Sequence, residues 1–178
     1  MKTVVPPDPV IQVWRMNPDT GTVDTTIAGV IQPLFIDLAD MQLVWDEGVR
    51  LKIRALRSEG LPNETGGVLL GYFDLVNRRV YVVDALPAPP DSSRERSGFE
   101  RGTEGLEANV DESKRRTADI VGYIGEWHSH PRNIEARPSN ADIKLLLHLA
   151  AMLQQDGFPA LMLIVGEDDE RWLIGNVV

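Results

Sequence analysis

The sequence of 178 residues contains no cysteine. Disulfide bonds, thiolate metal ligands and a cysteine nucleophile are therefore excluded. Any bound metal must be held by histidine and carboxylate groups, and any hydrolysis must proceed without a thiol. Histidine is scarce as well, because the chain has only three.

Long apolar runs are also missing. No stretch reaches the roughly 18 uninterrupted apolar residues that a membrane span requires. The first ten residues, MKTVVPPDPV, contain prolines where a signal peptide would have an apolar run. We therefore expect a soluble, cytoplasmic protein that has no membrane partner.

Basic residues are outnumbered, since 18 Lys and Arg stand against 27 Asp and Glu and give a net charge of -9 at pH 7. Proteins that bind nucleic acid present basic faces that displace the counterions of the phosphate backbone. We therefore expect no nucleic-acid partner and favour a protein or a peptide.

The chain length and a hydrophobic content of 43% suit one domain with a sizeable core. The first 35 residues contain five prolines: Pro6, Pro7, Pro9, Pro18 and Pro33. Short β-prone runs between them, such as 10–14, favour edge strands and loops. We therefore expect an N-terminal extension over 1–35 and one domain over 36–178.

Apolar residues recur every three or four positions between 38 and 58, which predicts an amphipathic helix over this range. These residues are Met41, Trp45, Val49, Ile53 and Leu56. Gly60 and Pro62 are expected to end the helix.

The rest of the chain alternates between β-rich and helical patterns. Two adjacent runs, 66–75 and 79–86, predict a pair of antiparallel strands. The remaining predicted elements are strands at 120–127, 160–166 and 171–177, and helices at 106–117 and 139–155. This order indicates an α+β fold with a mixed β-sheet sandwiched by helices. Residues of about 87–118 form an insertion, either a solvated surface loop or a loop that contacts substrate.

A group of possible metal ligands lies in the segment 125–143, GEWHSHPRNIEARPSNADI. His128 and His130 are two residues apart at the end of a predicted strand, so both imidazoles point to the same side. Asp142 follows in the first turn of the next helix. Two histidine nitrogens and one carboxylate oxygen leave the fourth position of tetrahedral zinc open, as in catalytic zinc sites. A water in such a position has its pKa lowered towards about 7, so a neighbouring carboxylate can take its proton.

Each of these features has a simpler explanation when taken alone. A His-x-His pair is common by chance on strands. Asp142 alone is explained by the preference for acidic residues in the first turn of a helix, where they interact favourably with the helix dipole. Here two of the three histidines precede Pro131 and a helix that begins at Ser139, a combination that packing does not explain. The third histidine, His148, shares a helix face with Lys144 and is interpreted as an ordinary exposed residue.

Two separated motifs resemble one family. The sequence HSHP at 128–131, followed by Ser139-x-x-Asp142, resembles the JAMM motif of the MPN+ (JAB) zinc metalloproteases. The upstream sequence ETGGVLLG at 64–71 resembles the segment of that family in which a glutamate precedes a glycine-rich first core strand. The resemblance implies a single MPN/JAB-like domain and covers about 38–178.

The resemblance also implies roles for individual residues. His128, His130 and Asp142 are the implied ligands of one zinc ion per chain. Glu64 is the implied general base and then general acid, and Ser139 the implied hydrogen-bond donor to the oxyanion. The family cleaves isopeptide or peptide bonds, often after the C-terminal glycine of ubiquitin or a ubiquitin-like protein.

The spacing departs from the motif at one point. Eleven residues separate His130 from Asp142, where the family commonly has ten, so the loop 132–138 must bulge by one residue. Ser139 keeps its place three residues before Asp142. The departure therefore affects the substrate groove more than the metal site.

Glu126 is a second candidate for the general base, because it lies two residues before His128 on the same strand face. We prefer Glu64, since it comes from another segment and can face the open coordination position. Glu126 shares a rigid strand with the ligands and is assigned a supporting role.

The sequences GFERGTEGL at 98–106 and GEWHSHP at 125–131 resemble the bacterial branch of the family, including the deconjugases of CBASS and ubiquitin-like operons. The sequence thus predicts a zinc-dependent isopeptidase or peptidase that cleaves ubiquitin-like or other protein conjugates in an anti-phage system. E1-like or E2-like proteins and a nucleotide cyclase are the partners that this resemblance implies. Two alternatives are a non-catalytic MPN scaffold and a hydrolase of small peptide or amino-acid adducts.

Overall fold

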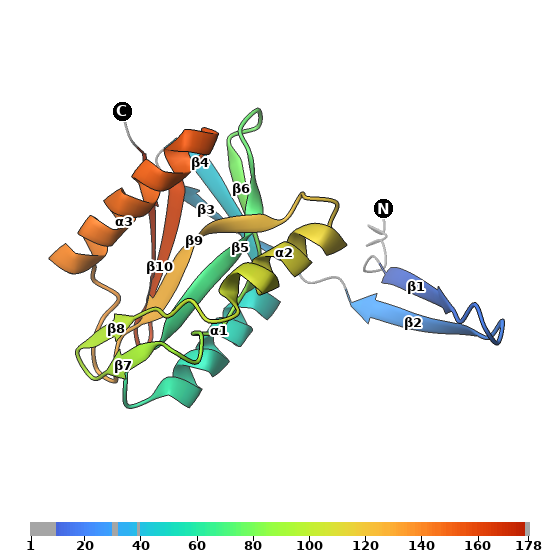
Figure 1. Cartoon of the computed structure of the whole chain (residues 1–178), viewed down its shortest axis with the longest axis horizontal. Coiled ribbons are helices and arrows are strands. Elements are labelled where there is room, and N and C mark those ends of the chain that lie inside the picture. The colour runs from blue at the N-terminus through green and yellow to red at the C-terminus, as the bar shows by residue number, and fades with distance from the viewer. Residues whose placement is uncertain (1–9, 30–31, 39, 177–178) are drawn as a thin grey trace, which may run out of the picture. The chain divides into compact units, whose positions relative to one another are not determined.

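The computed structural model describes residues 10–29, 32–38 and 40–176. The chain consists of two compact units, Met1–Gln32 and Pro33–Val178. In the first unit, β1 (Val10–Met16) and β2 (Val23–Gly29) form an antiparallel hairpin (Figure 1). Its turn is stabilised by the Asn17 side chain, which accepts the N–H of Asp19 at 2.9 Å. The strand expected at 10–14 is thus confirmed.

The second unit is built on a seven-stranded sheet with the order β11-β10-β9-β5-β6-β4-β3 (Figure 1). Its strands are β3 (Pro33–Leu38), β4 (Met41–Asp46), β5 (Gly66–Asp74), β6 (Arg79–Ala85), β9 (Gly122–Ser129), β10 (Ala160–Val165) and β11 (Glu170–Gly175). The pairs β9–β10 and β4–β6 are parallel and the other pairs are antiparallel. The sheet is therefore mixed, as predicted.

Helices cover both faces of this sheet. They are α1 (Glu47–Gly60), α2 (Leu106–Arg116) and α3 (Asn140–Leu153), the last followed by the short 3-10 helix Gln154–Asp156. Successive residues of β10 point to opposite faces: Leu163 packs in one cluster with Ile53 of α1, and Met162 packs in another with Leu149 of α3. The α2 helix packs on the side of Val68. The predicted α+β fold with a helix-covered sheet is confirmed.

The helix predicted over 38–58 is wrong for its first part. Residues 41–46 form β4, and the helix begins only at Glu47, after Asp46 caps it by accepting the N–H of Val49 at 2.9 Å. Strand β4 lies between β3 and β6 and is buried on both faces. A strand buried on both faces is mostly apolar, so Met41 and Trp45 match a helical spacing without forming a helix.

The other predicted elements are confirmed with shifts of a few residues at their ends. The insertion holds α2 and a small hairpin that was not predicted, formed by β7 (Ser93–Glu95) and β8 (Gly98–Glu100). Within the described ranges, no helix combines the length and the apolar character needed to cross a membrane.

Candidate metal centre and active site

The two candidate histidine ligands lie at the end of β9, between β5 and β10. His128 is the second-last residue of the strand, and His130 follows just beyond it, where its backbone N–H donates to the carbonyl of Val165 at 2.9 Å. The two residues are 8% and 9% exposed, and their ring centroids are 5.5 Å apart. The strand end therefore brings both imidazoles to one buried location.

The start of α3 places the carboxylate. Ser139 and Asp142 form a reciprocal capping box: Asp142 Oδ2 accepts the N–H of Ser139 at 2.6 Å, and Ser139 Oγ accepts the N–H of Asp142 at 3.2 Å. The other carboxylate oxygen, Asp142 Oδ1, lies 3.3 Å from His128 Nε2. The helix cap thus fixes Asp142 and leaves one oxygen facing the histidine.

The three side chains offer a nitrogen, nitrogen and oxygen donor set suited to zinc. Their ligand atoms all lie within 4.8 Å of one another. His130 Nδ1 donates to the carbonyl of Glu135 at 2.7 Å, which fixes the tautomer and leaves Nε2 free to bind a metal. Burial lowers the pKa of His128 to about 4, although Asp142 opposes this shift. His128 is therefore neutral near pH 7, which is the form that binds metals.

Glu64 faces the same group from the loop between α1 and β5. A pocket of about 220 Å³ is lined by all five residues to which the resemblance assigns a role: Glu64, His128, His130, Ser139 and Asp142. Burial raises the pKa of the Glu64 carboxyl, Asp142 adds to the rise, and His130 opposes it. A carboxyl group with a raised pKa in a pocket is suited to accept and return a proton.

Ser139 lines the mouth of this pocket and is exposed. Because its Oγ accepts the N–H of Asp142, the hydroxyl hydrogen remains free to donate. The residue therefore combines a structural role at the helix start with a hydroxyl group that is free to donate at the pocket.

Glu126 also lines the pocket but has a different environment. Its Oε1 accepts from Arg101 at 3.0 and 2.9 Å and lies 3.3 Å from the hydroxyl of Tyr123. The side chain is thus held in a largely buried ion pair. This arrangement matches the supporting role assigned to Glu126 more closely than that of a proton acceptor.

The sequence did not single out Arg101 or Phe99. Both belong to the segment that carries β8 and line the pocket, and the ring of Phe99 lies against Gly66, where an added Cβ would come 2.5 Å from Phe99 Cε1. The backbone N–H of Glu64 donates to the carbonyl of Glu95 in β7 at 2.8 Å. The hairpin therefore forms one wall of the site, which favours the substrate-contacting interpretation of the insertion.

Arg57 is a further residue that the sequence analysis missed. It is buried on α1, and its guanidinium donates to the carbonyls of His130 at 3.2 Å and Pro131 at 3.1 Å. Its position four residues after Ile53 places a charge on the apolar face of the helix. That placement is the signal that could have identified it.

The chain is similar to several known proteins. Residues 46–175 match the family described as prokaryotic homologs of the JAB domain. A CD-NTase/cGAS isopeptidase from Enterobacter hormaechei subsp. hoffmannii is 33% identical over 106 residues, which are 60% of this chain and 57% of the relative. A probable metalloprotease from Sinorhizobium fredii is 26% identical over 110 residues, 62% of this chain and 66% of the relative.

Two further similarities extend over more of the matched proteins. A CD-NTase/cGAS isopeptidase from Escherichia coli is 28% identical over 137 residues, which are 76% of this chain and 83% of the relative. A solution structure of a Desulfitobacterium hafniense protein has a TM-score of 0.49 and 23% identity, with 72% of this chain and 79% of that chain covered. The chain spans less than two thirds of the length of the Enterobacter and Sinorhizobium relatives.

Proposed function

Because the chain belongs to the family of prokaryotic homologs of the JAB domain, we propose that it is a zinc-dependent isopeptidase or peptidase that cleaves ubiquitin-like or other protein conjugates. One observation carries the proposal: two buried histidines and one half-buried aspartate lie together beside Glu64, whose pKa is raised. The names of the relatives, isopeptidase and metalloprotease, support the reaction class.

We assign His128, His130 and Asp142 as the ligands of one zinc ion per chain. Their donors leave room for a fourth ligand, which distinguishes a catalytic from a structural zinc site. Zinc bound there supplies Lewis-acid polarisation of the scissile carbonyl and activates water. The alternative of a non-catalytic scaffold is disfavoured, because the three donors and the glutamate are all present in one pocket.

Glu64 performs the proton transfers in this proposal. It takes one proton from the water whose oxygen bonds to the carbonyl carbon, and it returns that proton to the amine as the C–N bond breaks. Ser139 donates its hydroxyl hydrogen to the oxygen that becomes negatively charged. Arg57 and the capping box hold the backbone on either side of the loop between His130 and Asp142.

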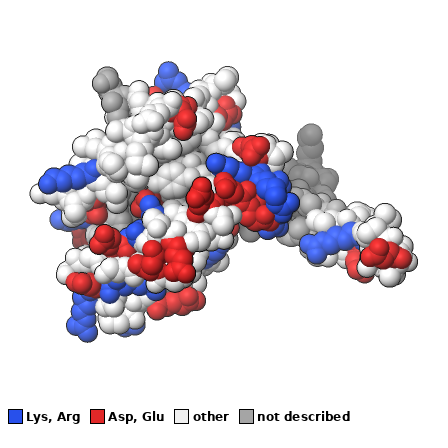
Figure 2. All heavy atoms as spheres, viewed as in Figure 1, with Lys and Arg blue, Asp and Glu red and all other residues white. Residues whose placement is uncertain are grey.

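The surface beside the pocket supports a protein-sized substrate. Leu145 lines the pocket and is 38% exposed, and Met152, two turns further along α3, is 50% exposed on the same side of the helix. Figure 2 shows an uncharged area over the α3 part of this face. An exposed apolar stripe that begins at the site suits the surface of a folded partner better than it suits a small adduct.

The setting of the reaction is part of the same proposal. Two relatives are named CD-NTase/cGAS isopeptidases, which supports a cytoplasmic anti-phage conjugation system with E1-like or E2-like proteins and a nucleotide cyclase. The genes that adjoin the coding sequence test this point, because a conjugation enzyme and a cyclase gene are expected beside it.

Replacing Glu64 tests the mechanism. Glu64→Gln keeps the size of the side chain but cannot accept a proton from water, so kcat on a protein conjugate should fall by about 10²- to 10⁴-fold. Zinc content should be unchanged, because Glu64 is not a ligand, and KM should change little, because the loss is confined to the transition state. Steady-state kinetics with elemental analysis measures both quantities.

Two matched variants complete this test. Glu126→Gln alters the other glutamate of the pocket and should retain turnover, whereas His128→Ala should lose both metal and activity. An inactive Glu126→Gln beside an active Glu64→Gln would show that the base is wrongly assigned. Faster cleavage of a short peptide than of a protein conjugate would favour small adducts as the substrates.

A further inference from the structure

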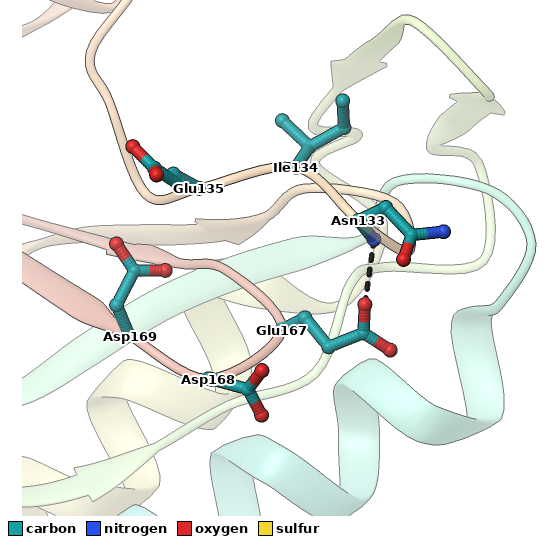
Figure 3. Close-up of a pocket in the computed structure, with 6 residues that line it drawn as sticks. All are labelled: Asn133, Ile134, Glu135, Glu167, Asp168 and Asp169. Atoms are coloured by element: carbon teal, nitrogen blue, oxygen red, sulfur yellow. Dashed lines mark hydrogen bonds between the residues drawn. The ribbon is translucent and has the colours of Figure 1, made fainter.

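The loop that joins β9, the strand that carries His128, to α3 is attached to an acidic turn between β10 and β11. We call residues 167–169 the acidic turn. Figure 3 shows this turn beside the loop segment that contains Asn133, Ile134 and Glu135, with the Glu167 carboxylate directed to Asn133. This loop is the one that has an extra residue relative to the JAMM motif.

Asp169 makes the first attachment. Both of its carboxylate oxygens lie 3.0 Å from the backbone N–H of Ala136, which is fully buried. The glycine that begins the turn makes this contact possible, because a Cβ on Gly166 would lie 2.0 Å from Asp169 Oδ1. A charged acceptor directed to a buried amide fixes the loop at Ala136.

Glu167 makes the second attachment. Its Oε2 accepts the N–H of Asn133 at 2.6 Å, the contact drawn as a dashed line in Figure 3. Asn133 has a φ of 61°, a left-handed conformation that asparagine adopts more readily than most residues. The loop is therefore held at the residue that has a left-handed backbone conformation.

The acidic turn is in turn held by α1. Arg54 donates to the carbonyl of Glu167 at 2.9 Å and pairs with Glu170 at 2.7 Å, and Arg50 pairs with Glu170 at 3.0 Å. These contacts connect the turn to a helix that packs on the core sheet. The turn can therefore act as a fixed support for the loop.

Glu135 lies between the two attachment points, and its carbonyl accepts the Nδ1–H of His130 at 2.7 Å. We infer that Asp169 is a positioning residue: by holding Ala136 it fixes the Glu135 carbonyl, which keeps His130 in the tautomer and orientation that present Nε2 to the metal. This inference rests on the proposed function in taking His130 as a ligand. An outer partner that orients a metal-binding histidine is a general requirement of such sites.

Asp169→Ala in the full chain tests the inference, with Asp168→Ala as the matched control. Asp168 has the same charge, belongs to the same turn, is exposed, and makes no hydrogen bond to the described residues. In metal-free protein at pH 8, long-range ¹H–¹⁵N NMR should show His130 protonated on Nδ1 in wild type and in Asp168→Ala. The Nε2-protonated form should increase in Asp169→Ala.

Zinc affinity gives a second measurement. Competition with a chromophoric chelator should show affinity lowered about tenfold in Asp169→Ala, the lower end of the range for outer partners of metal-binding histidines. If Asp169→Ala does not fold, the same measurements on Asp169→Asn and Asp168→Asn decide. The zinc affinity of Asp169→Asn should then fall by less than that expected for Asp169→Ala. Folded Asp169 variants that keep the wild-type tautomer and zinc affinity overturn the inference. Wild-type protein without zinc affinity refutes the proposed function, while the tautomer comparison still tests Asp169.

Discussion

At the scale of the residue, the Glu64 carboxyl is placed for function at a cost to stability. Burial raises its pKa in the folded chain, so ionisation is less favourable there than in the unfolded chain. The protonated carboxyl therefore stabilises the folded state, and this contribution is complete below the pKa of the unfolded chain, which is about 4.3. It is lost as the pH rises from that value through the higher pKa of the folded chain.

Glu64→Gln, which should reduce turnover, is accordingly expected to raise the melting temperature of zinc-free protein at pH 7. The gain should narrow as the pH falls towards about 4, because wild-type Glu64 is then protonated as well. Thermal unfolding of chelator-treated protein measures the difference. Glu126→Gln serves as the contrast, since it removes an ion pair with Arg101 and should lower the melting temperature. A lower melting temperature for Glu64→Gln at pH 7 would contradict the argument.

At the scale of the element, α3 links the proposed metal site to the surface. Its first turn carries Asp142, its buried side packs on β10, and Leu145 and Met152 extend along the side that adjoins the pocket. In the proposed function, this helix fixes the position of a docked protein conjugate relative to the site.

Charges placed on this stripe should separate docking from chemistry. Leu145→Glu and Met152→Glu should each raise KM for a protein conjugate about tenfold, which corresponds to a loss of about 1.4 kcal/mol of binding free energy. Met152→Glu should cleave a short peptide at a rate close to that of the wild type. Leu147→Glu is the matched control, because Leu147 is equally exposed at 53% but lies on the opposite flank of α3. Equal effects of the three changes would argue against the stripe as the docking surface.

At the scale of the whole molecule, the site is assembled on a sheet that has its own hydrophobic core. The largest core cluster includes Trp127, Leu163 and Ile53, and none of these residues is a proposed ligand. The fold should therefore persist without metal, in contrast to small domains that are unfolded without zinc.

We expect about one zinc per chain by elemental analysis, as for a catalytic site with three protein ligands. Chelator should abolish activity and leave the circular dichroism spectrum unchanged. Excess zinc should restore stability by about 2.7 kcal/mol at a free concentration 100 times Kd, which denaturant titration measures. Release should accelerate at acid pH, since the imidazoles must be neutral to bind. Active, unchelated protein that contains no zinc would disprove the assignment.

The sequence by itself determined the features that depend on neighbouring residues. The two-residue period of a strand predicts that His128 and His130 point to the same side, and the capping box fixes Asp142 relative to Ser139 through contacts within three residues. Most strands and helices were predicted for the same reason. The proximity of Glu64 to this group was implied only by the resemblance of its segment to a known family.

Only the tertiary structure decided the features that join distant segments. Residues 41–46 became a strand because β6 and β3 lie on either side of them, a burial that the local spacing does not reveal. Arg57 meets a carbonyl 73 residues away, Asp169 an amide 33 residues away, and Arg101 a carboxylate 25 residues away. The Asp169 contact depends on the strand order β11-β10-β9, which places the turn between β10 and β11 beside the end of β9. Strand order depends on how many segments pack at once, so it cannot be read from the periodicity of any one of them.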